Sequence, residues 1–349
     1  MVLLITGAEL LVRGASGLAA LIGISPLIVG LTIVAFGTSA PELAVSVRSA
    51  LHPDAGANIA LGNVVGSNIF NILFVLGISS IIAPLYVAQK LVRTDVPIMI
   101  IISALLFVLA IDGTVGRADG AVLLCGIIIY LFFAFYQERD EPETVKAEYE
   151  KEYGGIQNGN CRILLYIIMV ITGLGTLVLG SGWLVESAVK IANNMGVSDL
   201  VIGLTIVSAG TSLPEVATSV MATIKGERDI AIGNVIGSNI FNILAVVGIS
   251  ALVSQKGVNA ASSAIYFDIP FMTAVSVACL PVFFTGFRIS RWEGFVFIAY
   301  YICYTTYLIL RAREHDILPA FSDVMFLFVI PITALTLIIT VVYEKKKLN

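Results

Sequence analysis

The chain has 349 residues, of which 58% are hydrophobic and only 13% charged, and its formal net charge is −4. Soluble domains carry about 25% charged residues, and so apolar a chain would expose too much apolar surface in water. Composition therefore excludes a soluble enzyme and a disordered chain. The mean hydropathy of +0.97 indicates an integral membrane protein made mostly of helices. No basic stripe is present, and we expect no nucleic-acid partner.

Apolar segments long enough to cross a bilayer follow one another along most of the chain. A window of about 20 residues predicts eleven transmembrane helices, at residues 1–22, 25–50, 58–83, 96–111, 120–137, 162–190, 199–224, 229–253, 264–284, 292–310 and 318–343. The long polar stretch at 138–160 separates the first five from the last six. We interpret it as a solvated linker.

The distribution of Lys and Arg predicts the orientation of these helices. If the N-terminus lies outside, the loops that fall inside hold more Lys and Arg than the outer loops, and the basic tail Lys345–Lys347 lies inside. Cytoplasmic loops of membrane proteins carry this excess of positive charge. We therefore expect a multi-pass protein of the plasma (inner) membrane, with the N-terminus outside and the linker and C-terminus inside.

The strongest feature of the sequence is a duplication. Residues 27–50 and 200–223 are identical at 14 of 24 aligned positions, and residues 62–79 and 233–250 at 15 of 18. The matched residues include Glu, Asn, Ser, Thr and Pro, so the similarity is not a by-product of shared apolar composition.

The two copies are separated by five predicted helices, an odd number, so they enter the membrane in opposite directions. Inverted repeats of this kind build secondary transporters, with the substrate site near the midplane where the copies meet. We therefore predict an all-α integral membrane protein with two inverted five-helix repeats forming a ten-helix core. The first repeat covers 1–137, the linker 138–160, the second repeat 161–312, and an extra C-terminal helix and tail 313–349.

Two carboxylates, Glu42 and Glu215, lie deep inside the second and seventh predicted helices. A carboxylate at the bilayer centre costs roughly 3 kcal/mol even on lenient scales, and such residues usually serve a function. Arg13 is the main internal cation, but Glu9, four residues earlier, is its natural partner, and Glu186 also competes for it. A bound inorganic cation would compensate both carboxylates. The alternative is that both are protonated and hydrogen-bonded in the core.

Each carboxylate directly follows a proline, in GTSAPE at 37–42 and GTSLPE at 210–215. Proline removes a helical hydrogen bond and clashes with the carbonyl four residues earlier, so we expect an unwound turn whose carbonyls point into a cavity. Thr38 and Thr211 lie one turn before the carboxylates and share their faces. The alternative, a plain proline kink recapped by hydroxyls, does not explain the carboxylates.

The second duplicated block places polar residues along one helical face. Asn63, Ser67 and Asn71 follow one another at intervals of four residues, and Asn234, Ser238 and Asn242 repeat the pattern. Asn68 and Asn239 fall on a different face. For these two, helix packing is the favoured explanation, because asparagine and small residues join membrane helices.

Together the two copies offer carboxylates, hydroxyls, amide oxygens and freed carbonyls, a hard site of charge −2. Calcium takes six to eight oxygen ligands of this kind, whereas magnesium prefers to keep its waters. Sodium uses the same oxygens. The two histidines, His52 and His315, lie in loops, so a soft metal is not expected. Calcium and sodium competing for one site in an alternating-access protein would give exchange.

At these residues the chain resembles the sodium/calcium exchanger family, part of the cation/calcium exchanger superfamily, in its prokaryotic form. The resemblance covers residues 1–312 and rests on GTSxPE and GNxxGSNxxN, each present twice in inverted order. It implies antiport of calcium against sodium, with short helices one and six sliding past a rigid core. It carries ion-binding roles onto Ala35 (carbonyl), Thr38, Ser39, Glu42, Ser67 and Asn71, and onto Ser208 (carbonyl), Thr211, Ser212, Glu215, Ser238 and Asn242.

The chain departs from the family pattern in two places. Many relatives, including potassium-dependent ones, have aspartate where this chain has Asn242, which favours potassium independence and a site charge of −2 rather than −3. The segment 313–349 adds a helix beyond the usual ten, either as an anchor or as a protomer interface. The partners we expect are calcium, sodium and the lipid bilayer, with no cofactor and no obligate protein partner.

Other functions fit the sequence less well. A proton/calcium exchanger is the nearest alternative, since Glu42 and Glu215 could carry protons if desolvated. A channel would need a continuous pore, and a packing scaffold would not need two buried acids. The sequence shows no nucleophile–base pair, metal box or phosphate loop at membrane depth, so an enzyme is not expected.

Overall fold

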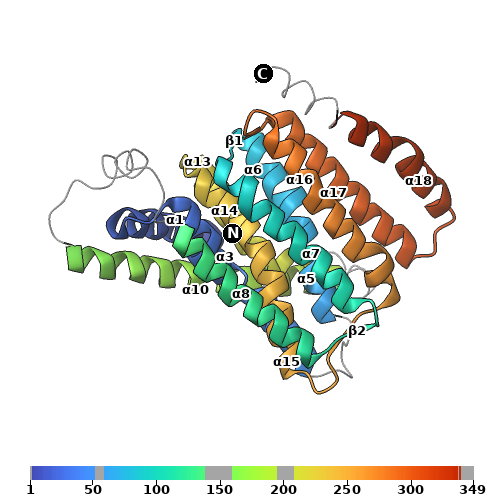
Figure 1. The fold of residues 1–349 in the computed structure, drawn as a ribbon, viewed down its shortest axis with the longest axis horizontal. Coiled ribbons are helices and arrows are strands. Elements are labelled where there is room, and N and C mark those ends of the chain that lie inside the picture. Colours follow the sequence, from blue (N-terminus) through green and yellow to red (C-terminus); the bar gives the residue numbers. More distant parts are fainter. Residues whose placement is uncertain (1, 52–58, 138–158, 195–207, 337, 339–349) are drawn as a thin grey trace.

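The computed structural model describes the chain apart from residues 1, 52–58, 138–158, 195–207, 337 and 339–349 (Figure 1). Most of the predicted 138–160 linker, the first part of the predicted helix at 199–224 and the basic tail therefore lie outside the described residues. The described part is a bundle of membrane-length helices joined by short loops. By length and composition, nine of its helices can cross a membrane, or ten if the bent pair Pro26–Thr38 and Ala40–Leu51 counts as one.

The first repeat forms five spans, several of them interrupted. The elements are α1 (Val2–Ile22); α2 (Pro26–Val29), η1 (Gly30–Val34), α3 (Ala35–Thr38) and α4 (Ala40–Leu51); α5 (Ile59–Phe70), η3 (Asn71–Leu76) and α6 (Gly77–Ile82); η4 (Leu91–Asp95) and α7 (Val96–Ala110); and α8 (Arg117–Gln137). The η elements are π-helical turns.

The second repeat follows the same order, and one further helix comes after it. The elements are α10 (Gly159–Asn194); α12 (Ser208–Thr211) and α13 (Leu213–Ile224); α14 (Arg228–Phe241), η7 (Asn242–Val247) and α15 (Gly248–Val253); η8 (Ala264–Asp268) and α16 (Ile269–Phe284); α17 (Arg291–Ala312); and α18 (Leu318–Val324) with η9 (Met325–Val329). The extra span runs from Leu318 to Thr336, and Tyr300 on α17 donates a hydrogen bond to Thr333 on it at 2.6 Å.

Two spans differ from the sequence-based expectation. The fourth begins at Leu91 rather than at residue 96, because its polar first turn is π-helical and buries Asp95, which accepts a hydrogen bond from the Tyr130 hydroxyl at 3.1 Å. The sixth, placed at 162–190 by its apolar residues and implied to be short by the family resemblance, is the 36-residue helix α10. Its apolar part, Arg162–Ser187, has 26 residues, about 39 Å of helix, which is longer than a hydrocarbon core of about 30 Å.

Two short strand pairs show that the repeats are inverted. β1 (Leu85–Tyr86) and β3 (Val258–Asn259) occupy corresponding loops of the two repeats, yet they do not pair with each other. β1 pairs with β4 (Arg288–Ile289), and β3 pairs with β2 (Thr114–Val115). Figure 1 shows β1 and β2 at opposite ends of the bundle. Corresponding loops therefore lie at opposite ends, as the odd number of intervening helices predicts.

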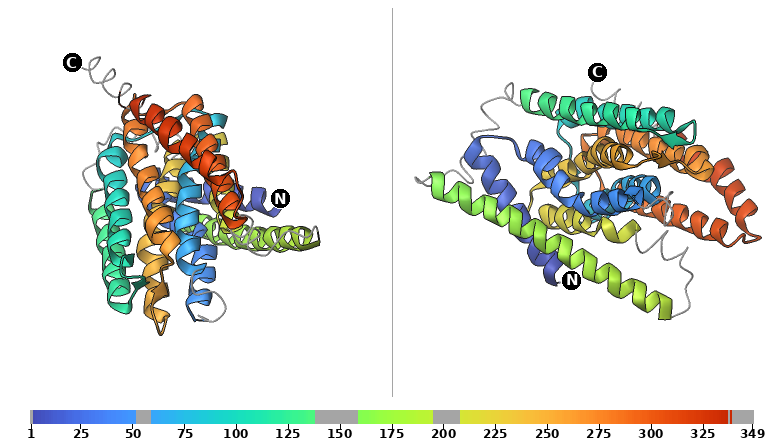
Figure 2. Two further views of the ribbon diagram at one scale, coloured as in Figure 1. Left: turned by 90° about the vertical axis from the view of Figure 1, so that its right-hand side faces the viewer. Right: turned by 90° about the horizontal axis from the view of Figure 1, so that it is seen from below.

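The buried apolar residues form two cores. The larger core joins α5, α7, α14, α16 and their neighbours. The smaller core is built around α1 and α10, which lie side by side along one side of the bundle and run obliquely to α7 and α17 (Figures 1 and 2). Their backbones touch, since a Cβ atom added to Gly173 would lie 2.7 Å from the Leu11 nitrogen. The two helices thus form one unit beside the main core.

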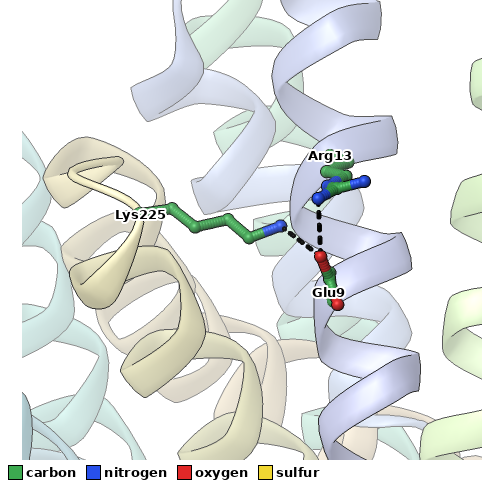
Figure 3. Close-up of polar contacts among 3 residues, drawn as sticks. All are labelled: Glu9, Arg13 and Lys225. Atoms are coloured by element: carbon green, nitrogen blue, oxygen red, sulfur yellow. Dashed lines mark hydrogen bonds and ion pairs between the residues drawn. The ribbon is translucent and has the colours of Figure 1, made fainter.

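An ion-pair cluster connects α1 to the end of α13 (Figure 3). Glu9 on α1 pairs with Arg13 at 2.7 Å, as the sequence predicts, and with Lys225, at the C-terminal end of α13, at 3.4 Å. Glu186, expected to compete for Arg13, pairs with Lys190 at 2.7 Å instead. The Glu9 and Lys225 side chains are 38% and 22% exposed.

We expect Lys225→Met to lower stability only slightly. Partly exposed ion pairs contribute at most about 1 kcal/mol, so the melting temperature of purified protein should fall by no more than about 3 °C. Lys190→Met, which removes the more exposed pair within α10, is the matched control. A much larger fall for Lys225→Met alone would show that this pair holds α1 against α13.

Candidate functional site

Both helices that carry the intramembrane carboxylates break just before the carboxylate. The chain bends by 45° between Pro26–Thr38 and Ala40–Leu51, and Ser39 at the break has ψ near 5°. In the second repeat Ser212 separates α12 from α13 with ψ near 10°. Pro41 and Pro214 are the second residues of the new helices, where a missing N–H is tolerated. The proline-induced break that the sequence predicts is confirmed.

Two further helices become π-helical at the asparagines of the second duplicated block. η3 begins at Asn71 and η7 begins at Asn242. A π-turn shifts the hydrogen-bond ladder by one residue, and such turns occur frequently at functional sites. These turns cannot be predicted from the sequence, because they leave no proline or glycine signature comparable to GTSxPE.

The predicted ion-binding residues come together between the two repeats. Every member whose side chain is described is buried, with relative exposures from 0% to 7%, namely Ala35, Thr38, Ser39, Glu42, Ser67, Asn71, Thr211, Ser212, Glu215, Ser238 and Asn242. The twelfth, Ser208, is the first residue of α12, and its side chain lies outside the described part.

Glu42 is held by hydroxyls from both repeats. Its Oε1 accepts hydrogen bonds from the Ser212 hydroxyl at 2.8 Å and from the Ser67 hydroxyl at 3.2 Å. Among the described residues, no donor reaches its Oε2. One carboxylate oxygen is thus fixed, and the other is left available.

Glu215 repeats the contact across the repeats, but among the described residues it has no counterpart to the Ser67 hydrogen bond. Its Oε1 accepts from the Ser39 hydroxyl at 3.4 Å, and Oε2 again has no described donor. Because each carboxylate bonds to the serine beside the other repeat's break, the two breaks and the two carboxylates lie together at one interface.

The threonines make a second set of contacts across the repeats. Thr38 donates to the amide oxygen of Asn234 at 3.0 Å, and Thr211 donates to that of Asn63 at 3.2 Å. Ser238 lies 3.3 Å from Thr38 and donates to the Ala35 carbonyl at 3.5 Å. This places the predicted carbonyl ligand of the first repeat beside a serine of the second.

Two serines complete the support of these asparagines, and the sequence analysis did not single them out. Asn63 donates to Ser46 at 3.1 Å, and Asn234 donates to Ser219 at 2.9 Å. Both serines stand four residues after a site carboxylate in the duplicated segment. That spacing, one helical turn beyond Glu42 or Glu215, is the signal that could have identified them.

Four buried oxygens at this interface accept no hydrogen bond from any described residue. They are Glu42 Oε2, Glu215 Oε2, Asn71 Oδ1 and Asn242 Oδ1, two from each repeat. Leaving a buried acceptor unsatisfied costs about 1–3 kcal/mol, and more when it is charged. Within the described part of the chain, no Lys or Arg pairs with either carboxylate. Carboxylate and amide oxygens of this kind are the ligands that a hard cation prefers.

Comparison with known proteins identifies the family of the chain. A family model described as "Sodium/calcium exchanger protein" matches residues 1–136 and 165–310. The chain belongs to the sodium/calcium exchanger family. The family match includes both broken helices and both asparagine blocks, and this family consists of membrane transporters that exchange cations for calcium.

Individual relatives extend over nearly the whole exchanger core. Sodium/calcium exchanger MaX1 of Methanosarcina acetivorans is 32% identical over 347 residues, covering 88% of this chain and 96% of the relative. Inner membrane protein YrbG of Escherichia coli K12 is 34% identical over 287 residues, covering 80% and 86%. A structure of the sodium-calcium exchanger NCX_Mj soaked with Na⁺ and Ca²⁺ superimposes with a TM-score of 0.73 at 31% identity, covering 86% and 93%.

Proposed function

We propose that this exchanger carries calcium against sodium, both bound in turn at the interface of the two broken helices. The four acceptor oxygens without donors carry the proposal, because they come in matching pairs from both repeats, one carboxylate oxygen and one amide oxygen from each. A protonated carboxyl would need an acceptor for its proton, and among the described residues neither Oε2 has a hydrogen-bond partner of either kind. The set is therefore suited to receive a cation.

The composition of the site supports calcium and sodium as competing substrates. Two carboxylates balance one divalent ion or two monovalent ions, and the serine and threonine hydroxyls add neutral oxygen ligands. Calcium accepts six to eight oxygens in flexible geometry. If one set of oxygens serves both ions, occupancy by one excludes the other, which makes transport an exchange.

The two cores support an alternating-access movement. The ion ligands belong to α3, α4, α5, α12, α13 and α14 and to the π-turns η3 and η7, whereas α1 and α10 pack mainly on each other. We propose that α1 and α10 move together past the site and open it to one side of the membrane at a time. The long helix α10 takes the place of the short helix we expected in this role.

We also propose a location and an orientation. The YrbG relationship and the helix composition favour the plasma (inner) membrane, and the Lys and Arg distribution favours an outside N-terminus. Accessibility of single cysteines introduced at Thr114 and Arg288, which lie in loops at opposite ends, tests the orientation. Labelling from outside should modify the first and spare the second, and the opposite pattern would reverse the proposed topology.

Calcium uptake into proteoliposomes distinguishes the coupling ions. With purified protein, an outward sodium gradient should drive uptake, and an outward proton gradient of the same size in sodium-free buffer should not. Uptake driven by protons alone would show proton/calcium exchange. If neither gradient drives calcium uptake, calcium antiport itself is contradicted.

We expect Asn242→Asp to change monovalent-ion dependence more than calcium selection. A new carboxylate raises the charge of the site from −2 to −3, so an additional monovalent cation can be bound with calcium or in its place. The measurement is uptake at varied sodium and potassium. Unchanged dependence on both ions would show that residue 242 does not set the charge balance of the site.

A further inference from the structure

Four buried asparagines form a closed bridge between the repeats. Asn68 on α5 donates to the backbone carbonyl of Asn239, at 3.2 Å, and Asn239 on α14 donates to the backbone carbonyl of Asn68, at 3.3 Å. The side-chain oxygen of Asn68 accepts from Asn242 at 3.0 Å, and that of Asn239 accepts from Asn71 at 3.1 Å. All four side chains are at most 1% exposed.

The backbone carbonyls fix which way every amide in this bridge points. A carbonyl can only accept a hydrogen bond, so the amide nitrogen of Asn68 must face Asn239, and its oxygen must face the other way. Asn242 meets that oxygen and must therefore present its own nitrogen. By the same argument, the backbone carbonyl of Asn68 requires the amide nitrogen of Asn239 to face it. The side-chain oxygen of Asn239 then requires Asn71 to present its nitrogen. Rotating any amide by 180° would place two acceptors or two donors together.

This constraint determines where the ligand oxygens point. Because Asn242 and Asn71 give their nitrogens to the bridge, their oxygens lie on the opposite edge of each amide, and these are the buried oxygens without described donors. Asn71 follows Ser67 by one helical turn, and Ser67 donates to Glu42. The free amide oxygen is therefore on the face that bears the carboxylate site.

We infer that Asn68 and Asn239 are positioning residues, which hold the amide oxygens of Asn242 and Asn71 toward the transported ion. This inference rests on the proposed function. Each positioning residue acts on the ligand of the opposite repeat, since Asn68 orients Asn242 and Asn239 orients Asn71. They fall on a different helical face from the ligands, and sequence reasoning placed them only in helix packing.

A packing role alone makes a different prediction from a positioning role. If Asn68 only joined α5 to α14, its loss would weaken the fold and add its effect to that of any ligand mutation. If it acts through Asn242, its loss should matter only while Asn242 carries an amide. A double-mutant cycle distinguishes the two.

The experiment measures equilibrium binding of ⁴⁵Ca to purified, detergent-solubilised full-length protein, so that variants unable to transport remain measurable. Asn242→Ala removes one neutral oxygen ligand, a loss comparable to that of a hydrogen bond to a charged group, and should raise the calcium Kd about tenfold. Asn68→Ala should raise it about threefold to tenfold, since the amide of Asn242 is then free to rotate. The Asn68→Ala/Asn242→Ala double variant should bind like Asn242→Ala alone.

Two controls keep the result interpretable. Ser79→Ala removes a buried hydroxyl from α6, in the same span as Asn68, with no hydrogen-bond partner among the described residues, and should leave the calcium Kd within about twofold. If Asn68→Ala does not yield folded protein, the mirror cycle of Asn239→Ala with Asn71→Ala tests the same claim.

The outcomes separate this inference from the proposed function. Failure of wild-type protein to bind calcium would contradict the proposed function before any variant is compared. Binding by wild type, with Asn68→Ala unchanged or with additive effects in the double variant, would overturn the positioning role and leave the proposed site intact.

Discussion

Glu42→Gln should abolish calcium exchange while leaving a folded protein. Removing one charge from a buried, compensated set costs about 3–5 kcal/mol, which weakens calcium binding at least about a hundredfold. The Gln side-chain oxygen can still accept from Ser212 and Ser67, as Oε1 of Glu42 does. The measurement is calcium uptake by proteoliposomes, with melting temperature as the test of folding. Glu215→Gln should behave in the same way.

Glu186→Gln is the matched control for these variants. Glu186 is an exposed carboxylate on α10 that pairs only with Lys190 among the described residues, so its neutralisation should leave uptake unchanged. Robust uptake by either Glu42→Gln or Glu215→Gln would refute the proposed site.

Gly237→Ala should destabilise the protein and weaken calcium binding together. A Cβ atom at this position would lie 2.5 Å from the Leu31 carbonyl oxygen and 2.7 Å from Cβ of Ala35, so α14 and the η1–α3 segment would have to separate. Overpacking of this kind costs about 1–3 kcal/mol. The neighbouring Ser238 would lose its contact with the Ala35 carbonyl. Melting temperature and calcium Kd measure the two effects.

Gly62→Ala tests whether the losses expected for Gly237→Ala come from the close approach of two helices or from the replacement of any glycine in the duplicated block. Gly62 lies in the duplicated block of the first repeat, but no described atom lies within 4 Å of a Cβ added there. Alanine also has the higher helix propensity. We therefore expect Gly62→Ala to bind calcium like wild type. Equal losses in both variants would show that the packing argument for Gly237 is wrong.

The sequence was sufficient to predict most of the described spans, the inversion of the repeats and the depth of the two carboxylates. Glu42 and Glu215 stand out because an uncompensated acid at membrane depth is costly, and Pro41 and Pro214 predict the breaks because proline cannot continue a helix hydrogen-bond ladder. Chain order and an odd helix count then require opposite orientations. These inferences depend on local chemistry and on counting, which a single sequence provides.

The cross-connections could not be obtained from the sequence. Ser212 lies close to Glu215 in the sequence, yet its hydroxyl donates to Glu42. Residues of each repeat therefore bond to the other repeat at their interface. Asn68 similarly bonds across to Asn239 and Asn242. Such pairings depend on the relative placement of two helices more than 140 residues apart, which periodicity within one helix does not determine.

The most direct test of the shared site is equilibrium binding of ⁴⁵Ca to the purified wild-type chain with sodium as competitor. One site formed by both carboxylates predicts one calcium bound per chain, complete displacement by sodium, and no specific binding to the Glu42→Gln/Glu215→Gln double variant. Calcium that sodium does not displace, or specific binding that survives in the double variant, would contradict a single shared site between the two repeats.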